Sequence, residues 1–214
     1  VDITTTAGLI DLNGATLVIA EGATPALDTG AGEGNIEITG TVNGTTGGAV
    51  ETLTLDAGTG NITLSGAVSG AAGAVDATGL TTVTISDAEV VQTEAFNISG
   101  TLSNTNALTG AFTSDGTLTV GALTLIGGIF NLNQGFDVAG AVSITNTGLL
   151  TLAGVNSTAG DGGEAVTVSG AVNLAVDITT TAGLIDLNGA TLVIAEGATP
   201  ALDTGAGEGN IEIT

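Results

Sequence analysis

The loop TAGDGGEAV, residues 158–166, holds two carboxylates, Asp161 and Glu164, among small residues. Hard cations such as Ca²⁺ prefer carboxylate and carbonyl oxygens on flexible turns. Asp161 and Glu164 are therefore a candidate metal site, and Ca²⁺ is the only cofactor we expect, if the chain binds one. The segment GAGEGNIEI, residues 30–38, partly matches the calcium-binding nonapeptide of β-rolls, but Asn35 stands where an Asp belongs, so a Gly-rich corner is the favoured interpretation there.

The composition excludes most other chemistry. The 214 residues include 22 Asp and Glu but no Lys, Arg, His or Cys. Thiol, imidazole and amine catalysis are absent, and zinc and copper lose their preferred ligands. Two carboxylates are enough for a glycosidase. However, part of the sequence recurs identically, so a catalytic pair would be repeated along an array of units, and the chain has no Arg and no aromatic platform to bind a sugar. We expect no enzyme. A net charge of −22 without a cation also argues against nucleic-acid binding.

An identical repeat organises the chain. Residues 1–39 and 176–214 are the same sequence, so that Val1 recurs as Val176. This predicts one full unit, 1–175, followed by the start of the next, 176–214, within a tandem array whose partners are further copies of the repeat. Apolar residues of one parity continue through the junction from Val166 to Ile178, so we expect 1–214 to be one continuous segment. The first residue is Val, and neither end has a distinct cap sequence, which favours a piece of a longer rod.

Short strands recur throughout the chain. Apolar pairs at i and i+2, such as Ile36 and Ile38 or Leu53 and Leu55, alternate with Thr, Ser, Glu or Asp, and Gly, Asn and Asp separate the pairs. Looser internal repeats of about 20 to 30 residues predict an all-β parallel β-helix, or β-solenoid. At about 4.8 Å per coil, a unit of roughly 6 to 9 coils would extend the rod by about 30 to 45 Å. Tandem β-sandwich domains are the alternative.

Two residue groups have structural roles in this prediction. Asn35, Asn61 and Asn97 each begin a similar strand, and we expect either an amide ladder at a corner of the helix or ordinary turn chemistry. Phe96, Phe112, Phe130 and Phe136 cluster in the middle of the chain. Interior stacking is the favoured interpretation of these aromatics, and a binding patch is the alternative. No apolar run reaches the 18 or so residues needed to span a bilayer, so we expect no membrane insertion.

The phrases LTLDAGTGNITLSGAVSG and GNIEITGTVNG resemble the repeats of giant bacterial surface proteins, the β-strand-repeat and filamentous-haemagglutinin-like adhesins and autotransporter passengers. The resemblance implies secretion to the cell surface, a β-helical rod and a non-enzymatic role. We therefore expect a structural segment of a very long, acidic, extracellular fibre, stalk or adhesin shaft, which self-associates if it builds fibres. A calcium-dependent or carbohydrate-binding adhesin module is the alternative.

Overall fold

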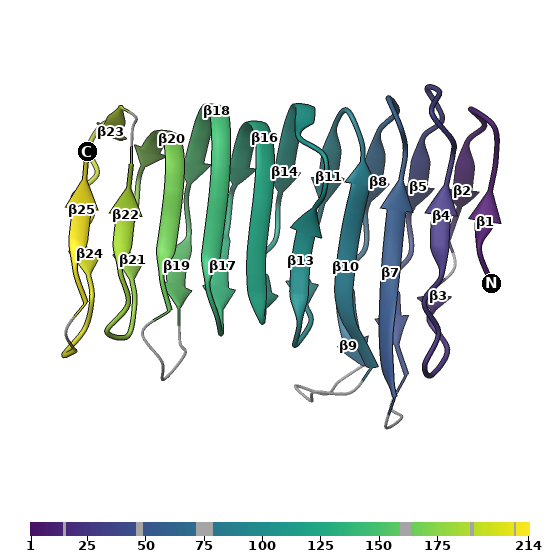
Figure 1. Cartoon of the computed structure of the whole chain (residues 1–214), viewed down its shortest axis with the longest axis horizontal. Coiled ribbons are helices and arrows are strands. Elements are labelled where there is room, and N and C mark those ends of the chain that lie inside the picture. The colour runs from purple at the N-terminus through teal and green to yellow at the C-terminus, as the bar shows by residue number, and fades with distance from the viewer. Residues whose placement is uncertain (15, 46–48, 72–78, 159–163, 189–190, 208) are drawn as a thin grey trace.

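The computed structural model describes residues 1–14, 16–45, 49–71, 79–158, 164–188, 191–207 and 209–214. The described residues form 25 strands and no helix. Every strand pairing is parallel, and the chain winds as a β-solenoid of about nine turns. The predicted parallel β-helix is confirmed, and the β-sandwich alternative is wrong because a sandwich is built from antiparallel sheets. The strands lie side by side along one axis, with the termini at opposite ends (Figure 1).

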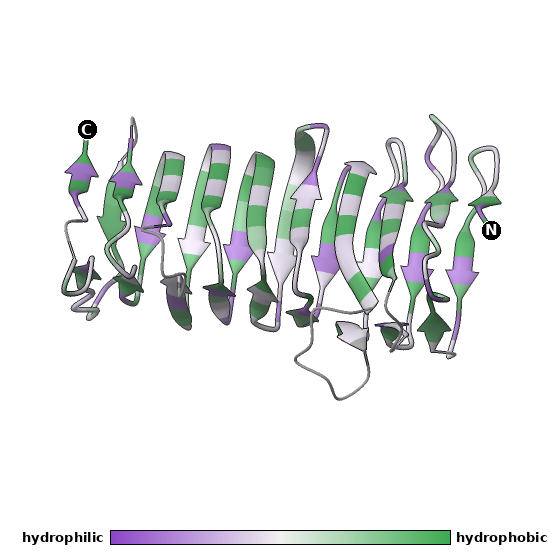
Figure 2. Cartoon of the chain, turned by 60° about the horizontal axis from the view of Figure 1, so that its bottom comes forward, coloured by the Kyte–Doolittle hydropathy of each residue, from purple (hydrophilic) through white to green (hydrophobic). Residues whose placement is uncertain are grey.

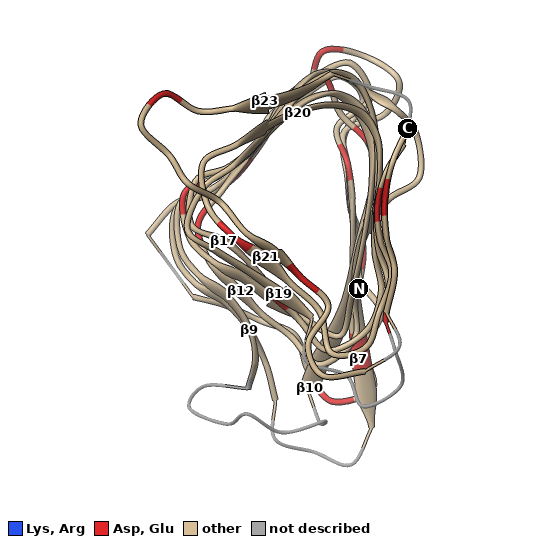
Figure 3. Ribbon diagram, turned by 90° about the vertical axis from the view of Figure 1, so that its left-hand side faces the viewer, with Lys and Arg blue, Asp and Glu red and all other residues tan. Residues whose placement is uncertain are grey.

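Each turn has three sides, and a view along the axis shows the turns superimposed in a three-sided outline (Figure 3). Face 1 contains β1 (Ile3–Thr4), β4 (Ala26–Asp28), β7 (Val50–Asp56), β10 (Gly79–Asp87), β13 (Thr101–Asn104), β22 (Ile185–Leu187) and β25 (Ile211–Ile213). Face 2 contains β2 (Ile10–Leu12), β5 (Ile36–Ile38), β8 (Ile62–Leu64), β11 (Val91–Thr93), β14 (Leu108–Ser114) and β23 (Leu192–Ile194). Three long strands cross both faces in succession, which joins them into one 16-stranded sheet: β16 (Ala122–Leu132), β18 (Val142–Leu152) and β20 (Val166–Leu174).

Face 3 is a separate nine-stranded sheet with one strand from each turn. Its strands are β3 (Leu17–Val18), β6 (Val42–Gly44), β9 (Val68–Ala71), β12 (Phe96–Asn97), β15 (Leu118–Val120), β17 (Gly135–Val138), β19 (Val155–Thr158), β21 (Ile178–Thr179) and β24 (Leu202–Asp203). The turns differ in length, since the step along the chain from Val68 to its partner Phe96 is longer than the step from Leu118 to its partner Phe136. The strands of each face remain paired despite this difference, and five of the pairings contain a register shift.

Alternation along each strand makes the core. In β7 the side chains of Leu53 and Leu55 are buried, whereas Thr52 and Thr54, at the alternate positions, are partly exposed on the outer side. The same alternation of hydrophobic and hydrophilic residues is visible along most strands (Figure 2). Because successive turns are paired, the side chains of Val, Ile, Leu and Phe stack on one another inside the solenoid and remove a continuous apolar column from water.

The hydrophobic core continues past residue 175, where the sequence repeats. Val172, Leu174 and Ile178 are each at most 2% exposed. β20, at the end of the first copy, pairs with β22 and β23 of the second copy, and β19 pairs with β21. All three faces therefore carry backbone hydrogen bonds across the junction.

Candidate functional site

The predicted cation loop is only partly described. Asp161 lies outside the described residues, and Glu164 is half-buried in the loop just before β20, where its backbone carbonyl accepts a hydrogen bond from the Thr158 hydroxyl at 3.4 Å. Among the residues that the structure describes, no group of three or more Asp and Glu side chains comes together as a metal site. Calcium binding at Asp161 and Glu164 therefore stays a prediction about this loop.

The three asparagines do not form a single column. Asn35 and Asn61 precede β5 and β8 at the corner between faces 1 and 2, and the Asn61 backbone N–H donates to Asn35 Oδ1 at 2.9 Å. Asn97 lies instead in β12 on face 3, in register with Ser69 and Thr119. The interpretation of one shared corner ladder is corrected by this placement: the three strand-opening phrases are alike, but the third occurs at another side of the turn.

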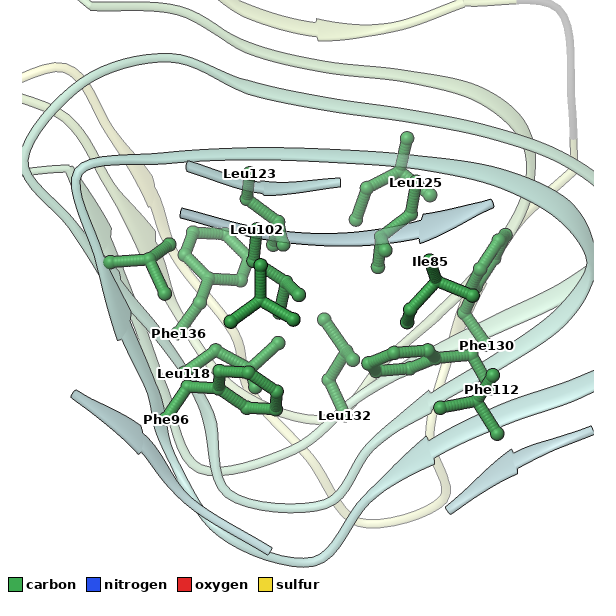
Figure 4. Packing of buried hydrophobic residues seen from close by; sticks show 14 of the residues in the cluster. Ile85, Phe96, Leu102, Phe112, Leu118, Leu123, Leu125, Phe130, Leu132 and Phe136 are labelled. Atoms are coloured by element: carbon green, nitrogen blue, oxygen red, sulfur yellow. The ribbon is translucent and has the colours of Figure 1, made fainter. Parts of the chain in front are cut away.

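All four phenylalanines face the interior. Phe96 and Phe136 lie in face 3, Phe112 and Phe130 lie in face 2, and each is at most 1% exposed. The rings of Phe112 and Phe130 pack with centroids 6.3 Å apart and an interplanar angle of 49° (Figure 4). This tilted geometry is favourable for aromatic pairs. None of these rings is on the surface, so they do not form a binding patch there.

On the outside, face 3 carries a polar column along the rod. Ser69 Oγ donates to Asn43 Oδ1 at 2.8 Å, and Ser157 Oγ donates to Asp137 Oδ1 at 3.0 Å. Hydroxyl donors and amide or carboxylate acceptors thus meet on adjacent turns. The full column, in register, is Asn43, Ser69, Asn97, Thr119, Asp137, Ser157, Thr179 and Asp203.

Face 2 has a similar column in which threonines and amides alternate. Asn131 Nδ2 donates to Thr113 Oγ1 at 3.3 Å. The column on face 2 is Thr63, Gln92, Thr113, Asn131, Thr151 and Asn173.

Face 1 differs from the other two faces, because its central outward column contains only hydroxyl side chains between β7 and β20. The column on face 1 is Thr54, Thr84, Ser103, Thr124, Ser143 and Thr167.

Carboxylates also lie directly opposite one another on adjacent turns. Asp11 is in register with Glu37, and the second copy repeats the pair as Asp186 and Glu212. The sequence has no Lys, Arg or His to neutralise them. Like charges directly opposite one another across paired strands are destabilising, so these pairs make the rod's surface sensitive to dissolved cations.

Among the residues that the structure describes, one acidic residue is buried, and its sequence pattern alone did not reveal it. Glu51, at the second position of β7, has an exposed fraction of 0%. Its Oε1 accepts a hydrogen bond from the Thr45 hydroxyl at 2.8 Å, and its Oε2 has no hydrogen-bond partner within the described part of the chain. Glu51 lies two residues before Leu53 and four before Leu55, so the alternation of the strand places it on the buried side. Alternation alone does not predict burial of an acidic residue, however, because such residues are usually exposed.

A shallow hollow lies beside the unit junction, lined by Gly154, Val155, Asn156, Val176, Asp177 and Thr179. Asn156 is 1% exposed and donates through Nδ2 to the Asp177 carbonyl at 3.5 Å. Asp177 Oδ1 accepts the Ala201 backbone N–H at 2.7 Å. The polar groups of this hollow therefore hold adjacent turns together, and it offers a single carboxylate for chemistry.

Comparison with known proteins adds no identification. No known protein family, curated protein or solved structure matches the chain. Within the described ranges, no helix is long and apolar enough to cross a membrane.

Proposed function

We propose that this chain is a segment of a structural rod in a very long, secreted, acidic repeat protein. In this proposal the rod is the shaft of a fibre, stalk or adhesin at the cell surface, as in the filamentous-haemagglutinin-like class. It has no enzymatic role, and its work is to hold other parts of the protein at a distance. The unbroken stacking of all three faces across the unit junction is the observation that carries the proposal.

Continuity at the junction matters because a shaft is only as stiff as its weakest connection. In repeat proteins each unit contacts its neighbours, and stability is the sum of unit and interface terms. Here the interface between copies is built of the same backbone ladders and buried side chains as the interior of one unit. An array of such units is therefore one solenoid rather than a string of hinged domains.

A molecular ruler tests the proposal. The chain has no cysteine, so one cysteine near each end can carry a donor and an acceptor dye. We expect each added copy of residues 1–175 to lengthen the end-to-end distance by about 37 Å with a narrow distribution, at about 4.8 Å per turn. A broad distribution, or a mean that does not grow in proportion to the number of units, would count against the shaft.

The hydroxyl column of face 1 favours one second candidate, a carbohydrate-binding adhesin module. Thr84 and Ser103 lie in register near its middle and offer both donors and acceptors. Glycan-array binding by the intact chain would support this function if Thr84→Asp abolishes it while Thr113→Asp on face 2 does not. Equal loss in both variants would remove face 1 from consideration.

A further inference from the structure

The two identical copies occupy different faces of the solenoid. From β1, the pairings of face 1 can be followed turn by turn through β4, β7, β10, β13 and the first halves of β16, β18 and β20 to β22. β22, residues 185–187, has the sequence of β2, not of β1. The column that begins with the first strand of one unit therefore continues with the second strand of the next.

The other two faces show the same displacement. Face 2 begins at β2 and passes through β5, β8, β11 and β14 and the second halves of β16, β18 and β20 to β23, which repeats β3. Face 3 begins at β3 and leads through β19 to β21, which repeats β1. Each strand of the second copy thus lies on the face that precedes, in chain order, the face of the equivalent strand in the first copy.

The displacement does not come from a difference in local structure. Ile3 pairs with Leu27 in the first copy, and Ile178 pairs with Leu202 in the second. A hydrogen bond from the Ala26 N–H to Asp2 Oδ1 at 3.0 Å recurs from Ala201 to Asp177 at 2.7 Å. The two copies have the same turn geometry, so the displacement results from the number of faces in one unit.

One unit does not fill a whole number of turns. Its described residues form the strands from β1 to β20, and three of these, β16, β18 and β20, each cover two faces. The unit therefore occupies 23 faces, which is seven turns and two further faces. The next unit therefore begins on face 3, whereas the first unit begins on face 1.

We infer that successive units in the array are rotated by one face, so that each unit's surface points to a different side of the rod and three units restore the starting orientation. This inference rests on the proposed tandem array. The acidic pair shows the effect within this chain, since Asp11 and Glu37 lie on face 2 while their twins Asp186 and Glu212 lie on face 1. Over three units every side carries the pair, so a second rod lying alongside meets like charge from any direction.

Disulfide mapping on the present chain tests the rotation. Thr167 is in register with Asp186, and Asn173 is in register with Val193. The spacing of adjacent strands, about 4.8 Å, lies within the range that a disulfide spans. We expect Thr167→Cys/Asp186→Cys and Asn173→Cys/Val193→Cys to cross-link under mild oxidation, at least about tenfold more than Asn173→Cys/Asp186→Cys.

The pair Asn173→Cys/Asp186→Cys represents an unrotated unit, because β22 would then lie beside the second half of β20. Preferential cross-linking of that pair would overturn the inference. Failure of both rotated pairs, while Thr113→Cys/Asn131→Cys within the first copy cross-links, would overturn it as well. These cross-links do not depend on rod length or array size, so their failure and failure of the molecular ruler can be told apart.

Discussion

Ile3 and Ile178 are the same position in two copies of one sequence, yet Ile3 pairs with Leu27 on face 1 while Ile178 pairs with Asn156 and Leu202 on face 3. Both side chains belong to strands with the same immediate sequence. Which side of the solenoid a strand occupies is therefore not a local property. It depends on how many faces the preceding residues have already filled.

The first prediction concerns the interior aromatic pair. Phe130 is fully buried against Phe112, whereas its chain neighbour Ile129 is 45% exposed. Phe130→Ala removes a large side chain and leaves a cavity, so we expect a loss of about 3–5 kcal/mol in the free energy of unfolding. Ile129→Ala is the matched control and should cost less than about 1 kcal/mol. Urea denaturation followed by far-UV circular dichroism suits a chain without Trp or Tyr. Equal losses of unfolding free energy in the two variants would contradict the interior packing of Phe130.

The second prediction concerns the buried carboxylate. Glu51 is out of contact with solvent, and its Oε2 has no partner in the described part of the chain. Glu51→Gln replaces this buried carboxyl group, which has one oxygen without a partner, by a neutral amide of nearly the same volume, so we expect a rise of about 1–3 kcal/mol in the free energy of unfolding. Glu94→Gln removes a charge at an exposed position and should change it little. A destabilised Glu51→Gln would mean that the carboxylate has a stabilising partner.

Salt dependence gives the third prediction. Glu37 faces Asp11 directly, and added salt screens such repulsion. We expect the melting temperature of the chain to rise with NaCl concentration. Glu37→Gln should stabilise it at low salt by about 0.2–1 kcal/mol and flatten the salt dependence. Glu89→Gln is the control, because its backbone bonds to Gly60 and Gly110 place no carboxylate directly opposite it. An equal change in both variants would show that only net charge matters.

The fourth prediction concerns the corner between faces 1 and 2. A Cβ atom on Gly60 would overlap the carbonyl oxygen of Gly34 on the adjacent turn. We expect Gly60→Ala to lower the free energy of unfolding by about 1–3 kcal/mol, since the two backbones would have to separate. A Cβ atom on Gly128 in β16 would have more room, because its nearest neighbour, the Gly110 carbonyl oxygen, would be 3.2 Å away. Gly128→Ala should cost clearly less, and a larger loss there would contradict the close approach at the corner.

Much of the fold could be predicted because alternation is a local signal. The i, i+2 pattern of Leu53 and Leu55 indicates a strand and its buried side without knowledge of any neighbour. The continuity of apolar parity through the junction likewise predicted that the solenoid does not stop there. These inferences need only the residues within one strand or across one corner.

The face on which a strand lies could not be predicted. The likeness of FNISG to GNITL suggests that Asn97 belongs with Asn35 and Asn61. Because the turns differ in length, however, similar sequences do not recur on the same face. The burial of Glu51 was missed for a related reason, since its parity is apolar but its chemistry is not. Both depend on contacts between turns, which no single stretch of sequence contains.

The proposed shaft depends on stiffness across the unit junction. Electron micrographs of an array with several copies of residues 1–175 measure this stiffness through the local bending of the filament along its length. The stacking across residues 175 and 176 predicts straight filaments that bend no more at intervals of about 37 Å, the length of one unit at about 4.8 Å per turn, than anywhere between. Filaments that kink regularly at that interval would show hinged units and would contradict a continuous shaft.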